Sequence, residues 1–238
     1  MKKKTIIVFI IAVLLIAVPA AACGILGDNP PTENPPEDNS PKANPMEDNP
    51  YYMFEMGKLW AKRPIGEGDI VASYKDFTVT QEDVEWRKEY ALLAGENLRN
   101  TTDREVANIF IRGWLFVEEA ERQGVTYTQE EIDERIDSLR QHFADDDGSD
   151  PGLEQIYEYC AGAGITIDEY LEDLRQQLPN AILTGTLRNN FIENYYKENG
   201  IADAVKMREE YDNAMAAFYA YGDELLQAHK DEIRYYIG

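Results

Sequence analysis

The stretch FVEEAERQGVTYTQEEIDERI, residues 116–136, contains a helix end followed closely by a helix start. Gly124 suits the position just after a helix, where the backbone takes a left-handed conformation that glycine adopts without strain. Thr128 stands three residues before Glu131, the spacing of a capping box, in which both side chains accept hydrogen bonds from backbone N–H groups at the helix start. The stretch therefore predicts two helices joined by a short break.

The same capping signature occurs at three other places: Thr80 with Asp83, Thr102 with Glu105, and Thr166 with Glu169. Acidic residues in a first helical turn are favoured by the helix dipole, so these carboxylates need no metal-binding or acid-base role to explain them. Apolar residues then recur at three- and four-residue spacing, as in Val106, Phe110, Trp114 and Val117. The sequence predicts a mostly α-helical protein.

A short strand pair is expected before these helices. The segment DIVASYKDFTVT, residues 69–80, is rich in β-branched residues on both sides of Lys75 and Asp76, which predicts a hairpin or two extended pieces around a turn. Later in the chain, Pro179 is expected to start or kink the helix that follows it. One apolar stripe predicts a long C-terminal helix over residues 203–236, which could bend at Gly222; the stripe consists of Tyr211, Met215, Phe218, Gly222, Leu225, His229, Ile233 and Tyr236.

The N-terminus has the composition of an export signal. Lys2 to Lys4 are followed by thirteen apolar residues, 6–18, and by the small residues of PAAA. Thirteen apolar residues are short for a membrane span, so residues 1–22 are predicted to be a cleaved signal peptide, with a retained anchor as the alternative. The export of the chain would place it outside the cytoplasm.

Residues 23–52 are predicted to be a disordered tether, because they are rich in Pro, Asn, Asp and Glu and contain almost nothing to bury. The folded domain is expected over residues 53–238. The formal net charge of the whole chain is −22, which argues against nucleic acid as a partner, since phosphate binding requires clustered Lys and Arg.

The segment AVPAAACG, residues 17–24, resembles a bacterial lipoprotein signal. The resemblance implies that Cys23 is lipidated, becomes the mature N-terminus and anchors the protein to the cell membrane. An ordinary signal peptidase could instead cut before Cys23. The second cysteine, Cys160, is expected to be buried as a small apolar residue.

Four stretches together resemble the N-terminal helical chaperone module of SurA/PrsA-type exported foldases: DIVASYKDFTVTQEDVE, FIRGWLFVEEAERQGVTYTQEEIDERI, GITIDEYLEDLRQQL and FIENYYKENGI. The resemblance covers residues 69–199. It implies a non-enzymatic chaperone that binds unfolded or exported polypeptides. Members of that family often carry a parvulin prolyl isomerase domain before a closing helix, but only NGIADAVKMREE, residues 199–210, stands at that place here, so no isomerase activity is expected.

Other catalytic and metal-binding patterns are not evident. No Gly-x-Ser-x-Gly motif occurs, and His142 and His229 stand far apart, each on a helical stripe, where packing or surface roles are expected. The acidic loop at residues 145–150 partly matches a calcium loop, but Phe143 occupies the first ligand position, so a solvated turn is preferred. No cofactor and no metal are predicted.

Aromatic residues are the candidate client-binding groups. Tyr and Trp offer large contact areas with little rotamer entropy to lose, which suits promiscuous binding. Phe110 and Trp114 are expected to be buried, whereas six other rings are predicted to form an exposed cradle for clients: Trp86, Tyr90, Tyr195, Tyr196, Tyr219 and Tyr221. The alternative is a dedicated interaction module that binds one partner, or that forms a homodimer through the Tyr-rich terminal helix.

Overall fold

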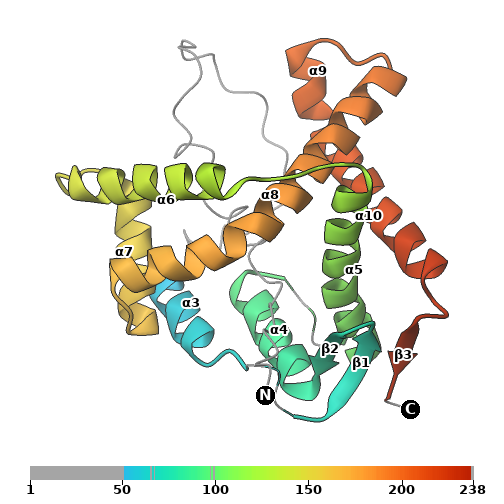
Figure 1. Ribbon diagram of the computed structural model, residues 1–238, viewed down its shortest axis with the longest axis horizontal. Helices are drawn as coiled ribbons and strands as arrows, with labels where there is room; N and C mark the ends of the chain where they lie inside the picture. Colours follow the sequence, from blue (N-terminus) through green and yellow to red (C-terminus); the bar gives the residue numbers. More distant parts are fainter. Residues whose placement is uncertain (1–50, 65, 67, 97, 99, 237–238) are drawn as a thin grey trace.

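A computed structural model describes residues 51–64, 66, 68–96, 98 and 100–236 (Figure 1). The predicted signal peptide, Cys23 and nearly all of the predicted tether lie outside these residues. The described chain is mostly helical with one small antiparallel sheet, which confirms the predicted fold class. Its elements are α3 (Tyr52–Ala61), β1 (Ile70–Tyr74), β2 (Phe77–Thr80), α4 (Gln81–Leu93), α5 (Asp103–Arg122), α6 (Gln129–Ala144), α7 (Pro151–Ala163), α8 (Ile167–Glu198), α9 (Ala204–Glu209), α10 (Tyr211–Ala228) and β3 (Ile233–Tyr235).

All four predicted capping boxes are present. Thr80, Thr102, Thr128 and Thr166 are the N-caps of α4, α5, α6 and α8, and in each case the hydroxyl and the acid three residues later exchange hydrogen bonds with the backbone. Gly124 takes the left-handed conformation, with φ 79°, after α5 ends. These carboxylates are therefore used by their own helices.

Strands β1 and β2 form the predicted hairpin, in which Tyr74 pairs with Phe77. Lys75, in the turn between them, has φ 51°. This is a left-handed backbone conformation that residues other than Gly, Asn and Asp rarely adopt. Two hydrogen bonds from the Lys75 Nζ to Glu118 of α5, at 2.9 and 2.7 Å, hold its side chain in this position. The lysine thus connects the turn to a helix.

The prediction of one helix over residues 203–236 is wrong. The segment forms α9, then α10, and then β3, which lies beside β1 in a sheet of order β2-β1-β3. The three- and four-residue spacing continues past Ala228, but the backbone pairing of Ile233 with Tyr74 makes the last residues extended instead. Helix α10 continues through Gly222 and does not end there. A side chain at this position would overlap Arg112 and Phe116 of α5, so the glycine permits close packing of the two helices.

Two other expectations need correction. Helix α8 is a single helix of 32 residues with Pro179 inside it, so the first of the two effects expected of this proline, the start of a new helix, does not occur. Residues 51 and 52 do not belong to the tether, because Tyr52 is the first residue of α3 and is 6% exposed. Sequence reasoning did not predict α3, whose N-cap residue, Tyr51, makes no side-chain capping hydrogen bond.

The main core joins the sheet to α3, α4, α5 and α7. Figure 1 shows α3, α6 and α7 around the first half of α8, with the sheet, α5 and α10 on the other side of the molecule. Helices α3 and α7 touch backbone to backbone, because a side chain at Gly57 would overlap the main chain of Tyr159, and one at Gly162 would overlap that of Phe54. This contact fixes α3 beside α4 and creates the arrangement described next.

Candidate functional site

Five aromatic rings from four helices form a continuous row. The ring centroids of Tyr90 and Trp86, both on α4, are 5.3 Å apart, and Trp86 meets Trp60 of α3 edge to face at 5.9 Å. The row continues from Trp60 to Tyr159 of α7 at 6.5 Å, and from Tyr159 to Tyr170 of α8 at 6.0 Å. These separations are typical of favourable aromatic pairs.

Only the rings of Trp60 and Tyr170 reach the surface. Both are half-buried, whereas Trp86, Tyr90 and Tyr159 are 4%, 2% and 4% exposed. The expectation that Trp86 and Tyr90 are exposed is therefore wrong: helix α3 covers them, and the Trp86 Nε1 donates a hydrogen bond to the Leu59 carbonyl oxygen at 2.9 Å. These two rings form the buried end of the row.

A cation lies over the Trp60 ring of this row. The Arg63 guanidinium carbon is 4.6 Å from the centre of the Trp60 ring, within the range of a cation–π contact. Burial lowers the pKa of Arg63, and the charges of Asp83, Tyr159 and Asp173 oppose that shift. Within the described residues, the Arg63 side chain makes no hydrogen bond or ion pair. Its donors are thus held near an aromatic surface without a protein acceptor.

Trp60, Arg63 and Tyr170, with Asp173 one turn further along α8, are here called the Trp60 site. Burial raises the pKa of Tyr170 to about 12, so its hydroxyl stays neutral near pH 7. Burial also raises the pKa of Asp173, while the charge of Arg63 opposes this. The site offers two partly exposed rings, a carboxylate, and a guanidinium that has no hydrogen-bond acceptor among the described residues, and these groups can make apolar contacts and hydrogen bonds with an extended chain.

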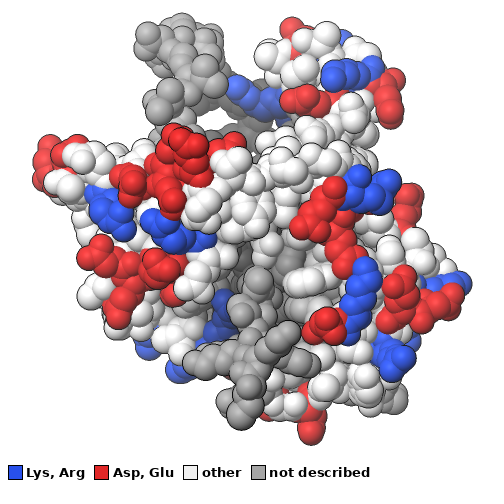
Figure 2. All heavy atoms as spheres, viewed as in Figure 1, with Lys and Arg blue, Asp and Glu red and all other residues white. Residues whose placement is uncertain are grey.

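The surface along the middle of α8 is uncharged. Residues 176–187 contain no Asp, Glu, Lys or Arg, although 29% of the whole chain is charged. Figure 2 shows this region as a white area between the acidic groups that gather over α6 and those at the end of α5. The part of α8 that follows Tyr170 and Asp173 thus leaves the Trp60 site with a neutral neighbour.

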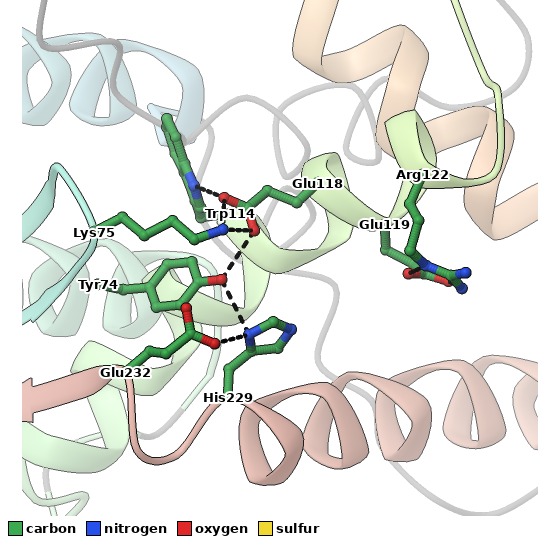
Figure 3. A network of polar contacts seen from close by, with 8 residues as sticks. All are labelled: Tyr74, Lys75, Trp114, Glu118, Glu119, Arg122, His229 and Glu232. Atoms are coloured by element: carbon green, nitrogen blue, oxygen red, sulfur yellow. Dashed lines mark hydrogen bonds and ion pairs between the residues drawn. The ribbon is translucent and has the colours of Figure 1, made fainter.

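A second cluster joins the sheet, α5 and the end of α10 (Figure 3). The Glu118 carboxylate accepts hydrogen bonds from the Tyr74 hydroxyl at 2.9 Å, from the Trp114 Nε1 at 3.1 Å and from the Lys75 Nζ. The His229 Nδ1 lies 3.2 Å from the Tyr74 hydroxyl and 2.8 Å from a Glu232 carboxylate oxygen. The network thus ties α5, the hairpin turn and the segment before β3 together.

Three groups of this network, Tyr74, Lys75 and Glu118, have pKa values shifted away from neutrality. Burial raises the pKa of Tyr74, and hydrogen bonds to Glu118 raise that of Lys75. Burial would raise the pKa of Glu118, but hydrogen bonds from Lys75, Tyr74 and Trp114 outweigh it and lower the value. A general acid or base works best with a pKa near the ambient pH, whereas these shifts lead away from neutrality. Tyr74, Lys75 and Glu118 thus keep constant charges near neutral pH while they connect these elements.

Glu119, the next residue, is 5% exposed and connects α5 to α10. It accepts two hydrogen bonds of 2.6 Å from Arg122, one of 2.7 Å from Gln123 and one of 2.5 Å from the Tyr221 hydroxyl. The bonds from Arg122 are the main cause that lowers the pKa of Glu119 to about 2, so its carboxylate stays ionised. Tyr221, predicted to bind clients, is half-buried in this contact.

The C-terminal tyrosines of the predicted cradle are not gathered on one surface. Tyr196 is 8% exposed and donates its hydroxyl to the Met207 carbonyl oxygen at 2.8 Å, so its expected exposure is also wrong. Tyr195 is half-buried beside it, in a small cluster with Ile192 and Ala214. Tyr219 is 46% exposed and is the member of the predicted set that offers the most free surface. Of the two rings expected to be buried, Phe110 is 5% exposed and Trp114 is half-buried.

The acidic loop uses its carboxylates internally. Asp150 caps α7 by accepting from the Gly152 N–H at 2.8 Å, and it also contacts the His142 Nε2 at 2.9 Å. Asp146 and Asp147 accept from backbone N–H groups two residues ahead. Within the described part of the chain, no group of three or more His, Cys, Asp or Glu is placed to hold a metal ion. Nor does any helix described there have the length and apolar character needed to cross a membrane.

Comparison with protein-family models, with curated proteins and with solved structures finds no match. The function proposed below therefore rests on the sequence and geometry of the chain itself.

Proposed function

We propose that the protein is an exported, non-enzymatic chaperone that holds unfolded polypeptide at the Trp60 site. The observation that carries the proposal is the aromatic row, because four helices converge to hold two partly exposed rings beside a guanidinium that no described residue pairs with. Rings that are already held in place by buried neighbouring rings lose little conformational entropy when they bind a chain. Such a surface can capture many sequences without chemistry.

The same site suits an extended backbone. Arg63 has five N–H donors and no protein acceptor within the described residues, and the carbonyl oxygens of an unfolded chain are suitable acceptors. The middle of α8, residues 176–187, carries no charge, so apolar side chains of a client can pack against this part of the helix. The net charge of −22 attracts basic client segments through a field that is screened within about 8 Å at physiological salt.

The proposed location follows from the sequence. We propose that the signal peptide directs export and that a lipid on Cys23 anchors the chain to the cell membrane, with residues 24–50 as the tether. Mass spectrometry of the native N-terminus tests this directly. A diacylated Cys23 supports the anchor, and an unmodified Cys23 or a retained signal contradicts it.

An aggregation assay tests the chaperone proposal. The protein is expected to suppress the aggregation of a chemically denatured, unrelated protein at near-stoichiometric ratios. Trp60→Leu combined with Tyr170→Leu should weaken suppression at least about tenfold, because it removes both partly exposed rings of the row. Tyr127→Leu, an exposed tyrosine before α6, is the matched control and should leave suppression unchanged.

Two outcomes would overturn the proposal. One is that the intact protein does not suppress aggregation. The other is that the double variant, shown by circular dichroism to remain helical, suppresses as well as the unchanged protein. Acceleration of a proline-limited refolding reaction would contradict the non-enzymatic part of the proposal.

A further inference from the structure

The sequence just before α3 matches the chemistry of the Trp60 site. Residues 28–50 contain seven prolines and six Asp or Glu, against a single Lys. Asn-Pro-Pro occurs twice in them, at 29–31 and 34–36, and a Glu follows each copy within two residues. A proline-rich chain favours polyproline II, which has no internal hydrogen bonds and leaves its backbone carbonyl oxygens free to accept. This segment, here called the proline segment, thus offers apolar rings, free carbonyl oxygens and carboxylates.

The two partly exposed rings of the site suit prolines. Proline-rich segments dock on aromatic surfaces, because a chain already in polyproline II loses little entropy on binding. The ring centroids of Trp60 and Tyr170 are 6.5 and 6.0 Å from that of Tyr159, the ring between them in the row. Polyproline II rises about 3.1 Å per residue, so about four residues reach from Trp60 to Tyr170. One Asn-Pro-Pro copy with the Glu that follows it is long enough for this.

The cations beside Trp60 favour an acidic segment. Residues 56–66 include Lys58, Lys62 and Arg63 but no Asp or Glu, within a chain of net charge −22. Lys62 is exposed, and the Arg63 side chain has no hydrogen-bond acceptor among the described residues. The Glu side chains and carbonyl oxygens of the proline segment are suitable acceptors. Because charges are screened within about 8 Å at physiological salt, these adjacent cations act on the segment more strongly than distant acids of the domain do.

The proline segment is joined to the helix that carries Trp60. Its last residue, Pro50, is separated from α3 by Tyr51 alone. Trp60 lies about 12 Å along α3 and residues 39–50 can span up to about 35 Å, so the chain is long enough to fold back to the site. A tethered segment has an effective concentration on the order of millimolar. A segment that binds with a dissociation constant of about 100 μM when free would therefore occupy the site about nine-tenths of the time.

We propose that the proline segment docks on the Trp60 site of its own chain. One Asn-Pro-Pro copy covers Trp60 and Tyr170, and the Glu after it pairs with Arg63. Docking at this place rests on the function proposed above, because the segment competes with clients for the same rings. A client that binds displaces the segment, which is then free to extend as the tether.

Binding of a labelled synthetic peptide with the sequence of residues 28–50, followed by fluorescence anisotropy, tests the docking. In a four-proline variant of the protein, alanine replaces Pro30, Pro31, Pro35 and Pro36. This variant should bind the peptide at least about tenfold more tightly than the unchanged protein, whose own segment already occupies the site. Pro41→Ala combined with Pro45→Ala, which leaves both Asn-Pro-Pro copies intact, is the matched control and should bind as weakly as the unchanged protein.

Changes in the site should remove this binding. In the four-proline variant, Trp60→Leu or Arg63→Gln should weaken peptide binding at least about fivefold, with circular dichroism showing that the helices persist. Tyr127→Leu should leave it unchanged. Equal peptide binding by the four-proline variant and the unchanged protein would overturn the proposal, as would full binding after Trp60→Leu. Dimerisation of the unchanged protein that the four-proline variant loses would place the segment on a second copy and overturn docking within one chain.

The aggregation assay separates this docking from the chaperone function. The four-proline variant should suppress client aggregation at about threefold lower concentration than the unchanged protein, because its site is not occupied in advance. If the peptide results hold but no variant suppresses aggregation, the docking stands and the chaperone function is wrong. If the unchanged protein suppresses aggregation but the four-proline variant does not bind the peptide, the chaperone function stands and the docking is wrong.

Discussion

Gly57 of α3 faces the carbonyl oxygen of Tyr159 in α7 so closely that no side chain fits between them. Gly162 has the same relationship to Phe54 on the other side of the contact. The two glycines let the helices touch, and this contact holds Trp60 over Tyr159. The position of the Trp60 site therefore depends on residues that have no side chain.

Replacing Gly57 by Ala should destabilise the protein. The added methyl group would overlap main-chain atoms, which cannot rotate away, and overpacking of this kind costs about 1–3 kcal/mol. Urea denaturation measures the change. Gly185→Ala is the control, because a Cβ there meets no atom within 4 Å. That variant should be more stable by about 0.5–1 kcal/mol, since alanine is preferred in a helix interior. Equal effects at the two positions would contradict the close contact.

Glu119 should make stability depend on acid pH. Its pKa is lowered from an ordinary value of 4.5 to about 2 in the folded chain, so the unfolded chain takes up the proton first as the pH falls. The stability from this group is complete above about pH 4.5 and is lost between about pH 4.5 and pH 2. Glu119→Gln should cost about 2 kcal/mol at neutral pH and reduce the slope in this window.

Urea denaturation at several pH values measures this slope. Glu121→Gln, at an exposed position two residues along the same helix, should change neither the stability at neutral pH nor the slope. If Glu119→Gln retained the full acid dependence, other carboxylates would have to cause it.

Strand β3 should contribute to global stability through Ile233. This side chain is 8% exposed and belongs to the main core, although it comes from the last described element of the chain. Ile233→Ala should cost about 2 kcal/mol, at the low end for a buried isoleucine because the strand lies at a sheet edge. Arg234→Ala, at the exposed neighbouring position, should cost less than about 0.5 kcal/mol. Faster hydrogen exchange in β1 of the Ile233 variant would locate the effect.

The Cys160 thiol should be unreactive in the folded protein. It is 4% exposed, and burial raises its pKa to about 11, so little thiolate exists near neutral pH. In a Cys23→Ser background, a thiol reagent at pH 8 should modify Cys160 only after urea is added. Rapid labelling without urea would show that α7 opens easily.

Local signals in the sequence predicted most of the helices. Thr128 and Glu131 lie within one turn and make their own capping contacts, so their pattern specifies a helix start in any fold. The hairpin around Lys75 was predictable for the same reason. Helix α3 was not predicted, because its first turn has no capping side chain and it follows a Pro-rich segment. Its place is decided by the contact of Gly57 with α7, which is remote in sequence.

The candidate site was less predictable than the fold. The sequence shows aromatic rings but not which helix will cover them, and Trp86 and Tyr90 are buried because α3 lies over them. Trp60 and Arg63 stand three residues apart, and the Arg63 N–H closes a turn on the Trp60 carbonyl oxygen just after α3 ends, so this short spacing is the signal that could have pointed to them. Tyr170 joins them only through Tyr159, a contact between α7 and α8 that the sequence does not reveal. The end of α10 was mispredicted for a similar reason, since only pairing with β1 makes Ile233 extended.

The sheet joins distant parts of the chain, with Ser73 and Tyr236 in contact across 163 positions. A polypeptide is made from its N-terminal end, so β1 emerges from the ribosome long before its partner β3. Until residue 235 has been synthesised, Tyr74 and Val71 lack the strand that covers that edge. The sheet is therefore complete only after a long-range pairing has closed, and pairings between residues far apart in the sequence form slowly because their loop-closure entropy must be overcome first.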